Sequence, residues 1–271
     1  MAYKAGNTPL IKSNELAKRF GFSILIKDES KNPFGTFKDR RSELVIKKAK
    51  DEHADTLVLI TSGNAGYSLE RFSEGTSIRI VNIVDKNLEK SIKDELKKYG
   101  EVIEADLSDE ILKPEDVISL ARQNDEEVIW DVSNGFHEAY EGIVEEIKQE
   151  NPDFIIVPVG SGEAFVGVYN GIKKCKLKAK LIGVGVKNKW HSFAERLHTP
   201  WTPYESKIQS ILKEGHQIIR LEEEEIKETY NRYKDMFDVE PSSAVVFGAL
   251  TKLKFKKEDK IILVNSGKGL A

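Results

Sequence analysis

Short apolar runs that alternate with helix-like segments constrain the fold of this chain more than any other feature. Residues 56–60 (Thr-Leu-Val-Leu-Ile), 154–159 (Phe-Ile-Ile-Val-Pro-Val) and 261–265 (Ile-Ile-Leu-Val-Asn) are such runs. Strands that read as continuous apolar runs are buried on both faces, as in parallel sheets covered by helices. The alternation therefore predicts an α/β fold with open, doubly wound parallel sheets.

The same rhythm continues along the chain. Residues 190–215 are the exception, because they show no clear periodicity and contain Pro200 and Pro203, so we expect a functional or mobile loop there. The other expected strands are residues 24–26, 78–84, 102–105, 128–131 and 181–186. The expected helices are residues 39–50, 64–73, 88–99, 114–122, 139–150, 164–174, 221–237 and 243–255.

Composition excludes several classes of protein. The 271 residues are 39% hydrophobic and 32% charged, with a formal net charge of −3, so no strong field for nucleic acid or an anionic membrane is expected. No apolar run approaches the roughly 20 residues of a membrane helix, and we expect no signal peptide. Cys175 is the single cysteine, which rules out an intramolecular disulfide and favours a cytoplasmic protein.

Residues 32–40 (Asn-Pro-Phe-Gly-Thr-Phe-Lys-Asp-Arg) place Lys38 after a Pro/Gly turn, at the start of an expected helix. A helix N-terminus carries a partial positive charge, which disfavours a second cation there. We therefore expect Lys38 to favour the neutral amine that Schiff-base chemistry needs. The alternative is an ordinary surface lysine at a helix start.

Two strand-to-helix junctions are built from glycine and small polar residues. They are residues 61–66 (Thr-Ser-Gly-Asn-Ala-Gly) and residues 160–164 (Gly-Ser-Gly-Glu-Ala). Free N–H groups at such junctions bind carboxylates or phosphates, and glycine lets a ligand approach the backbone. The alternatives are N-capping by Ser62 or Asn64 and, at the second junction, a structural turn. Phe165 replaces the last glycine of G-x-G-x-x-G, so a nucleotide-binding dehydrogenase is not expected.

The last expected strand runs into residues 264–269 (Val-Asn-Ser-Gly-Lys-Gly). This segment is not a P-loop, because Ile262 stands where the first glycine is needed and no Ser or Thr follows Lys268. Ser266 could instead hydrogen-bond a heterocyclic nitrogen at the strand end. The alternative is an ordinary turn after a strand.

Taken together and in this order, these segments resemble the tryptophan-synthase-β-like family of pyridoxal-5′-phosphate (PLP) enzymes, also called fold type II. Residues 6–10, 34–40, 62–66, 97–103, 240–244 and 266–270 match segments of the family, so the resemblance covers nearly the whole chain. It implies two open parallel-sheet three-layer domains with the cofactor cleft between them. We expect a larger PLP-binding domain of residues 1–52 plus 132–271, a smaller mobile domain of residues 53–131, and a homodimer.

The resemblance also implies a role for each candidate residue. Lys38 would carry PLP as a Schiff base and shuttle protons as the catalytic residue. Phe37 would lie against the cofactor ring, Asn64 would hydrogen-bond its 3′-oxygen, and Ser266 would contact its pyridine nitrogen. The substrate carboxylate would be bound by Thr61, Ser62, Gly63 and Asn64. The cofactor phosphate would be cradled by Gly160, Ser161, Gly162, Glu163 and Ala164.

Glu163 departs from what a phosphate requires. A carboxylate in this loop should repel a phosphate dianion unless its side chain points away. If Glu163 faces solvent, Glu163→Gly should change PLP affinity little.

The resemblance implies elimination or replacement chemistry on a small amino acid. The lysine segment, residues 240–244 and residues 266–270 are most similar to threonine synthase, which converts O-phosphohomoserine and water to threonine and phosphate. Alternatives are a cysteine synthase, a threonine or serine dehydratase, and a homologue that binds PLP or an amino acid without turnover. We expect no nucleic-acid, membrane or metal partner, since His191 and His198 are seven residues apart and no His residue lies in a ligand cluster.

Overall fold

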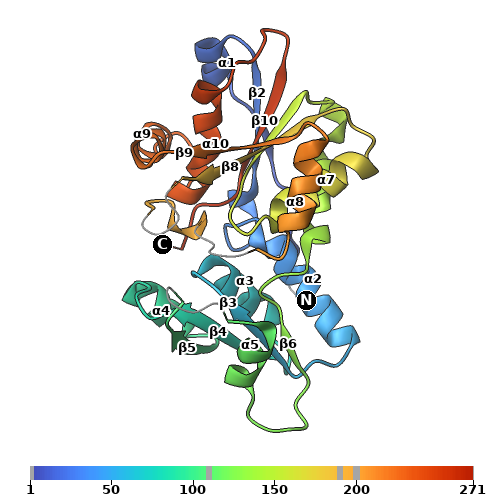
Figure 1. Cartoon of the computed structure of the whole chain (residues 1–271), viewed down its shortest axis with the longest axis vertical. Helices are drawn as coiled ribbons and strands as arrows, with labels where there is room; N and C mark the ends of the chain where they lie inside the picture. The colour runs from blue at the N-terminus through green and yellow to red at the C-terminus, as the bar shows by residue number, and fades with distance from the viewer. Residues whose placement is uncertain (1–2, 108–111, 188–191, 198–201, 271) are drawn as a thin grey trace. The chain divides into compact units, whose positions relative to one another are not determined.

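The chain divides into two compact units, each with its own sheet (Figure 1). The computed structural model describes residues 3–107, 112–187, 192–197 and 202–270. The four-stranded unit comprises the described parts of Met1–Ala5, Lys38–Phe136 and Leu270–Ala271; the six-stranded unit comprises those of Gly6–Phe37 and His137–Gly269. One boundary of these units falls between Phe37 and Lys38. The predicted domains, residues 1–52 plus 132–271 and a mobile domain of residues 53–131, stay a prediction.

The sheet of the six-stranded unit has the order β1-β2-β10-β7-β8-β9 within the described residues. In the part of the chain that the structure describes, only β1 is antiparallel to its neighbour in this sheet, and the other neighbouring pairs are parallel. Sequence analysis missed β1, because three residues at a sheet edge carry too little pattern. The strands are β1 Leu10–Lys12, β2 Ser23–Asp28, β7 Phe154–Pro158, β8 Lys180–Val186, β9 Gln217–Leu221 and β10 Lys260–Asn265.

Alternate residues of these strands enter two cores, one on each face of the sheet. On β10, Ile261 and Leu263 pack with residues of α1, α9 and α10, whereas Ile262 and Val264 pack with residues of α6, α7 and α8. This period of two gives the unit three layers. Its helices are α1 Asn14–Phe20, α6 Glu141–Ile147, α7 Glu163–Lys174, α8 Glu205–Lys213, α9 Glu223–Tyr233 and α10 Pro241–Lys252, with 3-10 turns η1 Glu29–Lys31, η2 His137–Tyr140, η3 Lys148–Glu150 and η4 Glu195–Leu197.

The four-stranded unit repeats this plan with a sheet that is parallel throughout its described residues, in the order β5-β4-β3-β6. Val81 and Ile83 of β4 pack against α5, whereas Val84 packs against α4 on the other face. The elements are strands β3 Thr56–Ile60, β4 Arg79–Asp85, β5 Glu101–Ala105 and β6 Ile129–Asp131, and helices α2 Lys38–Asp51, α3 Asn64–Ser73, α4 Lys90–Leu96 and α5 Pro114–Ala121.

The structure confirms the α/β fold with parallel sheets, and β3 and α3 have the predicted bounds. The helix expected at residues 221–237 is present as α9 but begins at Glu223, because Leu221 is the last residue of β9, a strand that sequence analysis missed. Residues 190–215 were expected to be a loop, which was wrong, because α8 lies there with Ile208 and Ile211 buried and Leu212 packed against the same core. These apolar positions span a single turn, which is too short a pattern to predict a helix.

Helix α1 was missed although its sequence carries both end signals. The hydroxyl of Ser13 accepts the N–H of Leu16 at 3.3 Å, and Gly21 ends the helix with a φ of 85°. Serine before a helix and a left-handed glycine after it are typical caps.

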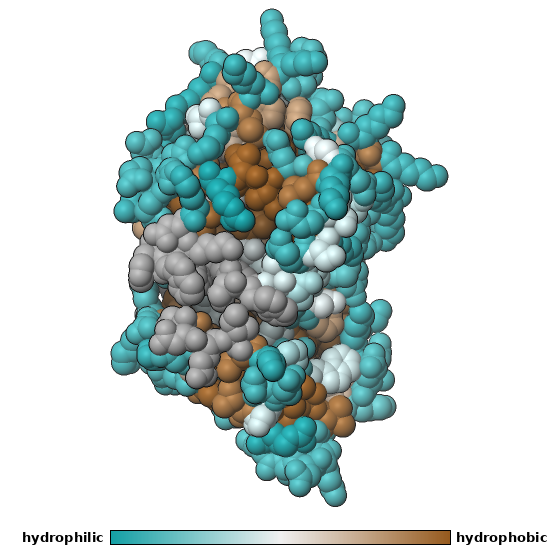
Figure 2. All heavy atoms as spheres, in the orientation of Figure 1, coloured by the Kyte–Doolittle hydropathy of each residue, from teal (hydrophilic) through white to brown (hydrophobic). Residues whose placement is uncertain are grey.

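Hydrophilic side chains cover most of the face of the six-stranded unit that is in view, with apolar residues between them (Figure 2). Lys174 and Glu145 form an exposed ion pair in this unit. Among the described residues, no helix is both long enough and apolar enough to cross a membrane.

Candidate functional site

The glycine loop, residues 160–164, and Ser266 lie at the carboxyl ends of strands in the six-stranded sheet. Strands β7 and β10 are parallel neighbours, and these residues follow their carboxyl ends. From β7 the chain winds outward through β8 and β9, and β10 then returns on the other side of β7. This is a topological switch point, where ligands of open α/β sheets bind. The glycine loop also leads into α7, whose first-turn N–H groups have no acceptor within the helix.

Backbone hydrogen bonds tie the segment before Lys38 to Ser266. The N–H of Phe37 donates to the carbonyl of Ser266 at 2.8 Å, and Thr36 forms a bridge with Gly267. Lys38 follows as the first residue of α2, as predicted. The ring of Phe37 packs against Tyr140 with centroids 5.1 Å apart. The residue that precedes Lys38 is therefore held at the switch point of the six-stranded sheet.

Ser266 is itself positioned by Ser243 on α10, a role that sequence analysis missed. The Ser243 hydroxyl accepts the N–H of Ser266 at 2.7 Å and donates to Asn265 Oδ1 at 2.6 Å. Ser266 is 5% exposed, and its own hydroxyl makes no hydrogen bond to the described residues. The sequence signal was the segment 240–244, to which no role was assigned.

The asparagine loop, residues 61–64, occupies the corresponding place in the four-stranded sheet. It follows β3, and the chain winds from β3 through β4 to β5 before β6 returns on the other side of β3. The N–H of Ile60 donates to the hydroxyl of Ser133, which follows β6, at 2.9 Å. Both predicted loops therefore lie at switch points.

Capping does not explain the side chains of the asparagine loop. Gly63 is the N-cap of α3, with a φ of 126° and no side-chain cap bond, so neither Ser62 nor Asn64 has the capping role considered above. The Thr61 hydroxyl instead accepts the N–H groups of Gly63 at 3.0 Å and Gly66 at 3.2 Å. Asn64 is buried at the first helical position, and Ser62 is exposed.

Lys38 and Asn64 begin two helices that are pinned together near their N-termini. The Ser68 hydroxyl on α3 is 2.6 Å from Asp39 Oδ1 and 2.8 Å from the Ser42 hydroxyl on α2. All three side chains are buried. The candidate lysine and the asparagine loop therefore share one rigid support within the four-stranded unit.

The helix that follows the asparagine loop, α3, carries a buried acid. Glu70 on α3 accepts a hydrogen bond from Asn82 on β4, and the two are 1% and 0% exposed. The pKa of Glu70 is raised to about 8, mainly by burial and also by nearby Glu95, against the hydrogen bond from Asn82. Gly66 leaves room for this pair, because a Cβ there would lie 2.2 Å from Asn82 Oδ1.

Glu163 does not face solvent, since it is 2% exposed. The hydroxyl of Tyr204, the residue before α8, lies 3.4 Å from Glu163 Oε1. The pKa of nearby His137 is lowered, first by burial and then by the positive charge of Lys207, whose Nζ lies 3.2 Å from His137 Nε2. The prediction that Glu163→Gly should change PLP affinity little assumed that Glu163 faces solvent. Because Glu163 is buried, that prediction no longer applies.

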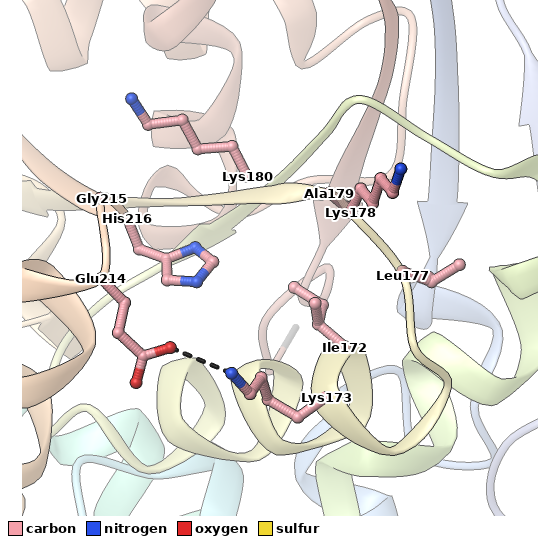
Figure 3. Close-up of a pocket in the computed structure, with 9 residues that line it drawn as sticks. All are labelled: Ile172, Lys173, Leu177, Lys178, Ala179, Lys180, Glu214, Gly215 and His216. Carbon is pink, nitrogen blue, oxygen red and sulfur yellow. Dashed lines mark hydrogen bonds and ion pairs between the residues drawn. The ribbon is translucent and has the colours of Figure 1, made fainter.

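A pocket of about 340 Å³ lies at the amino ends of strands in the six-stranded sheet (Figure 3). Lys180 begins β8, and His216, just before β9, accepts the N–H of Leu181 on Nδ1 at 2.9 Å. Because these are the amino ends of the strands, the pocket is separate from the glycine loop. Its lining residues are Ile172, Lys173, Leu177, Lys178, Ala179, Lys180, Glu214, Gly215 and His216.

The predicted residues thus fall into two groups. In the four-stranded unit the structure brings together Lys38 and the loop of Thr61, Ser62, Gly63 and Asn64. In the six-stranded unit it brings together Phe37, Ser266 and the loop of Gly160, Ser161, Gly162, Glu163 and Ala164. His191 and His198 lie outside the described residues.

Comparison with known sequences gives a consistent picture. The family described as "Pyridoxal-phosphate dependent enzyme" matches residues 1–267. A threonine synthase of Halalkalibacterium halodurans is 24% identical over 301 residues, covering 98% of this chain and 82% of that protein. A threonine synthase of Methanocaldococcus jannaschii is 23% identical over 310 residues, covering 98% and 75%. A cysteine synthase B of Salmonella typhimurium is 31% identical over 99 residues, covering 35% and 33%.

Solved structures share the fold. The maize serine racemase superposes with a TM-score of 0.83 at 19% identity, covering 98% of this chain and 89% of that chain. A PLP-dependent aspartate racemase superposes with a TM-score of 0.81 at 18% identity, covering 97% and 90%. At these identities the similarity concerns the fold and leaves the reaction open.

Proposed function

We propose that this chain, which belongs to the family of pyridoxal-phosphate dependent enzymes, catalyses elimination or replacement at the side chain of a small amino acid. The best candidate reaction is that of threonine synthase, the conversion of O-phosphohomoserine and water to threonine and phosphate. The observation that carries the proposal is the hydrogen bond from Phe37 to Ser266, which holds the residue before Lys38 beside a hydroxyl at a switch point. Similarity to threonine synthases over 98% of this chain supports the choice of reaction.

The residues present suit the cofactor of this family, pyridoxal 5′-phosphate. Ser266 offers a buried hydroxyl that is not used by the described residues, which suits a ring nitrogen. The glycine loop offers the first turn of the 12-residue helix α7, which suits a phosphate. Glu163 is the exception, because a buried carboxylate in this loop should repel a phosphate.

Each residue has a distinct task in this assignment. When bound, PLP supplies an electron sink for charge that develops at the substrate α-carbon. Lys38 holds the cofactor through its amine and moves the proton at the α-carbon. The Ser266 hydroxyl, unlike a carboxylate, leaves the pyridine nitrogen uncharged, which favours elimination and replacement over transamination. Phe37 would lie against the ring and Asn64 would bind its 3′-oxygen.

The two glycine-containing loops bind the anionic groups. Thr61, Ser62, Gly63 and Asn64 bind the substrate carboxylate, with Thr61 also shaping the loop through the N–H groups that it accepts. Gly160, Ser161, Gly162, Glu163 and Ala164 bind the cofactor phosphate, mainly through backbone N–H groups.

The test combines spectroscopy with two lysine variants. Purified protein with PLP should absorb in the visible, and borohydride reduction followed by peptide mapping should place the cofactor on Lys38. Lys38→Ala should lose the band, whereas Lys47→Ala, an exposed lysine of the same helix, should keep it. Absence of a band in the parent protein, or a reduced cofactor on another lysine, would contradict the proposal.

The substrate is identified by a panel of amino acids and their O-phospho and O-acetyl esters. Phosphate release from O-phosphohomoserine supports the threonine synthase reaction. A spectral change with O-acetylserine and sulfide would favour the cysteine synthase alternative, which the 99-residue similarity to cysteine synthase B supports. Ketoacid release from serine or threonine would favour a dehydratase. PLP binding with no turnover of any compound would favour a non-catalytic homologue.

The same proposal includes a cytoplasmic homodimer in which residues 53–131 close over the substrate and exclude water. Analytical ultracentrifugation at micromolar concentration should give twice the 30.6 kDa mass of the chain.

A further inference from the structure

Asn265, the last residue of β10, has a completely buried side chain whose amide is hydrogen-bonded on both sides. Its Nδ2 donates to Asp28 Oδ1 at 2.8 Å and to the carbonyl of Asp238 at 3.0 Å. Its Oδ1 accepts the Ser243 hydroxyl at 2.6 Å and the N–H of Gly267 at 3.3 Å. The amide therefore joins the end of β2, the segment before α10 and α10 itself to the end of β10.

These partners allow the amide only one orientation. A backbone carbonyl such as that of Asp238 can only accept a hydrogen bond, and the N–H of Gly267 can only donate one. Nδ2 must therefore face Asp238, and Oδ1 must face Gly267. Asp28, which is 5% exposed, provides a second acceptor on the Nδ2 side.

Asp28 is held in place from its own side of the network. It is the N-cap of the 3-10 turn η1, and its Oδ1 accepts the N–H of Ser30 at 3.2 Å and the Ser30 hydroxyl at 2.6 Å. The same oxygen accepts Nδ2 of Asn265. A residue with a local capping role thus also reaches a strand end more than 200 residues away.

The orientation of the amide decides how Ser243 is used. A serine hydroxyl has one proton to donate and lone pairs that accept. Because Asn265 Oδ1 takes the proton, the lone pairs face the N–H groups of Ser266 at 2.7 Å and Gly267 at 3.4 Å. The carbonyl of Ser266 accepts the N–H of Phe37. Both backbone groups of Ser266 are therefore engaged, and its hydroxyl is the group left for a ligand.

We propose that Asn265 is a positioning residue for the cofactor: through Ser243 it holds Ser266 where its hydroxyl donates to the ring nitrogen. Asp28 acts at the far end of the same chain of hydrogen bonds by holding the Nδ2 side of the amide. This inference rests on the proposed function, because it takes the ligand of Ser266 to be PLP.

The test compares PLP with 1-deaza-PLP, in which a C–H group replaces the ring nitrogen. Equilibrium dialysis of protein freed of PLP gives the dissociation constant of each compound, and their ratio isolates the hydrogen bond to the nitrogen. The parent protein should prefer PLP by about threefold to tenfold, as expected for one net hydrogen bond. Ser266→Ala should abolish the preference.

Asn265→Asp keeps the shape of the side chain but offers no N–H to Asp28 or to the carbonyl of Asp238. Two carboxylates then face each other, so the Ser266 hydroxyl is displaced and the preference for PLP should fall below about twofold. Asp28→Asn in the same background supplies an N–H between the two side chains and should restore most of the preference. In the Ser266→Ala background, Asn265→Asp should leave the ratio unchanged.

Asp153 provides a matched control at the other end of β10. Its Oδ2 accepts the N–H of Lys260, the first residue of the strand, at 2.8 Å. Asp153→Asn is an isosteric exchange of acid and amide away from Ser266, and it should leave the ratio unchanged. Thermal unfolding reports on the folding of each variant. Ser243→Ala removes the intermediate hydroxyl and should also abolish the preference, so it decides the question if Asn265→Asp does not fold.

A purely structural role would weaken both compounds equally. An unchanged ratio in Asn265→Asp or in Ser243→Ala would therefore overturn the inference, as would a further fall of the ratio when Asn265→Asp is added to Ser266→Ala. Failure of the parent protein to bind PLP would overturn the proposed function itself. A ratio that Ser266→Ala does not change would overturn the assignment of Ser266, which distinguishes these failures from that of Asn265.

Discussion

The Ser243 hydroxyl accepts the N–H of Ser266 at 2.7 Å and so joins α10 to the end of β10. Ser243 is fully buried, and Phe37 hydrogen-bonds the carbonyl of the same Ser266. Ser243 therefore fixes the backbone of Ser266 at the point where α10, the end of β10 and the segment that contains Phe37 meet.

Ser243→Ala should lower the free energy of unfolding by about 1 to 3 kcal/mol, because the buried N–H of Ser266 loses its acceptor. Urea unfolding followed by circular dichroism measures the change. Ser210→Ala, on the exposed side of α8, removes a hydroxyl that hydrogen-bonds the carbonyl of Ser206 in its own helix, and should cost far less. Equal losses in the free energy of unfolding would show that the Ser243 hydrogen bond stabilises the protein no more than that of an exposed serine.

Glu70 should make the protein less stable as the pH rises from about 4.5 to about 8. Its pKa is raised from 4.5 to about 8, first by burial and then by Glu95, against the hydrogen bond from Asn82. In this window the folded chain keeps a proton that the unfolded chain has lost, so folding is progressively disfavoured, by a total on the order of 5 kcal/mol. Above pH 8 both states are ionised and the penalty is constant.

Glu70→Gln tests this dependence, because glutamine keeps the shape and does not ionise. The variant should match the parent near pH 4.5 and exceed its stability increasingly up to pH 8. Glu52→Gln, at an exposed position of the same unit, should leave the pH profile of the parent intact. A constant difference between Glu70→Gln and the parent across this range would show that Glu70 titrates normally.

Glu127 should stabilise the protein above pH 4.5 and lose this effect as the pH falls. Its pKa is lowered to about 2, first by the hydrogen bond from Thr56, against burial, and also by Arg79. Between these values the folded chain has released a proton that the unfolded chain holds, so stability falls with falling pH. Glu127→Gln should remove this part of the acid transition, and thermal unfolding between pH 2 and pH 6 would detect it.

Asn64→Ala should reduce turnover more than cofactor binding. Asn64 is assigned to one oxygen of the cofactor ring, whereas the covalent bond to Lys38 and the phosphate contacts remain. We expect kcat to fall at least about tenfold while PLP titration changes little. Unchanged turnover would remove Asn64 from the proposed site.

Local pattern by itself determined most of the secondary structure and the candidate residues. The apolar run at residues 56–60 and the glycine-rich segment after it predict a strand, a loop and a helix, and β3 and α3 have these bounds. The position of Lys38 at a helix start was equally evident, because a Pro/Gly turn precedes it. These features depend on neighbours a few residues apart, which a sequence displays directly.

Tertiary structure alone decided how these parts are used. Strand order places both loops at switch points, and it depends on which distant strands pair, as β7 does with β10. The support of Ser266 comes from Ser243, 23 residues away, and a donor to Glu163 comes from Tyr204, 41 residues away. A sequence shows that Glu163 is an acid in a glycine loop, but the direction of its carboxylate depends on packing between helices that are distant along the chain.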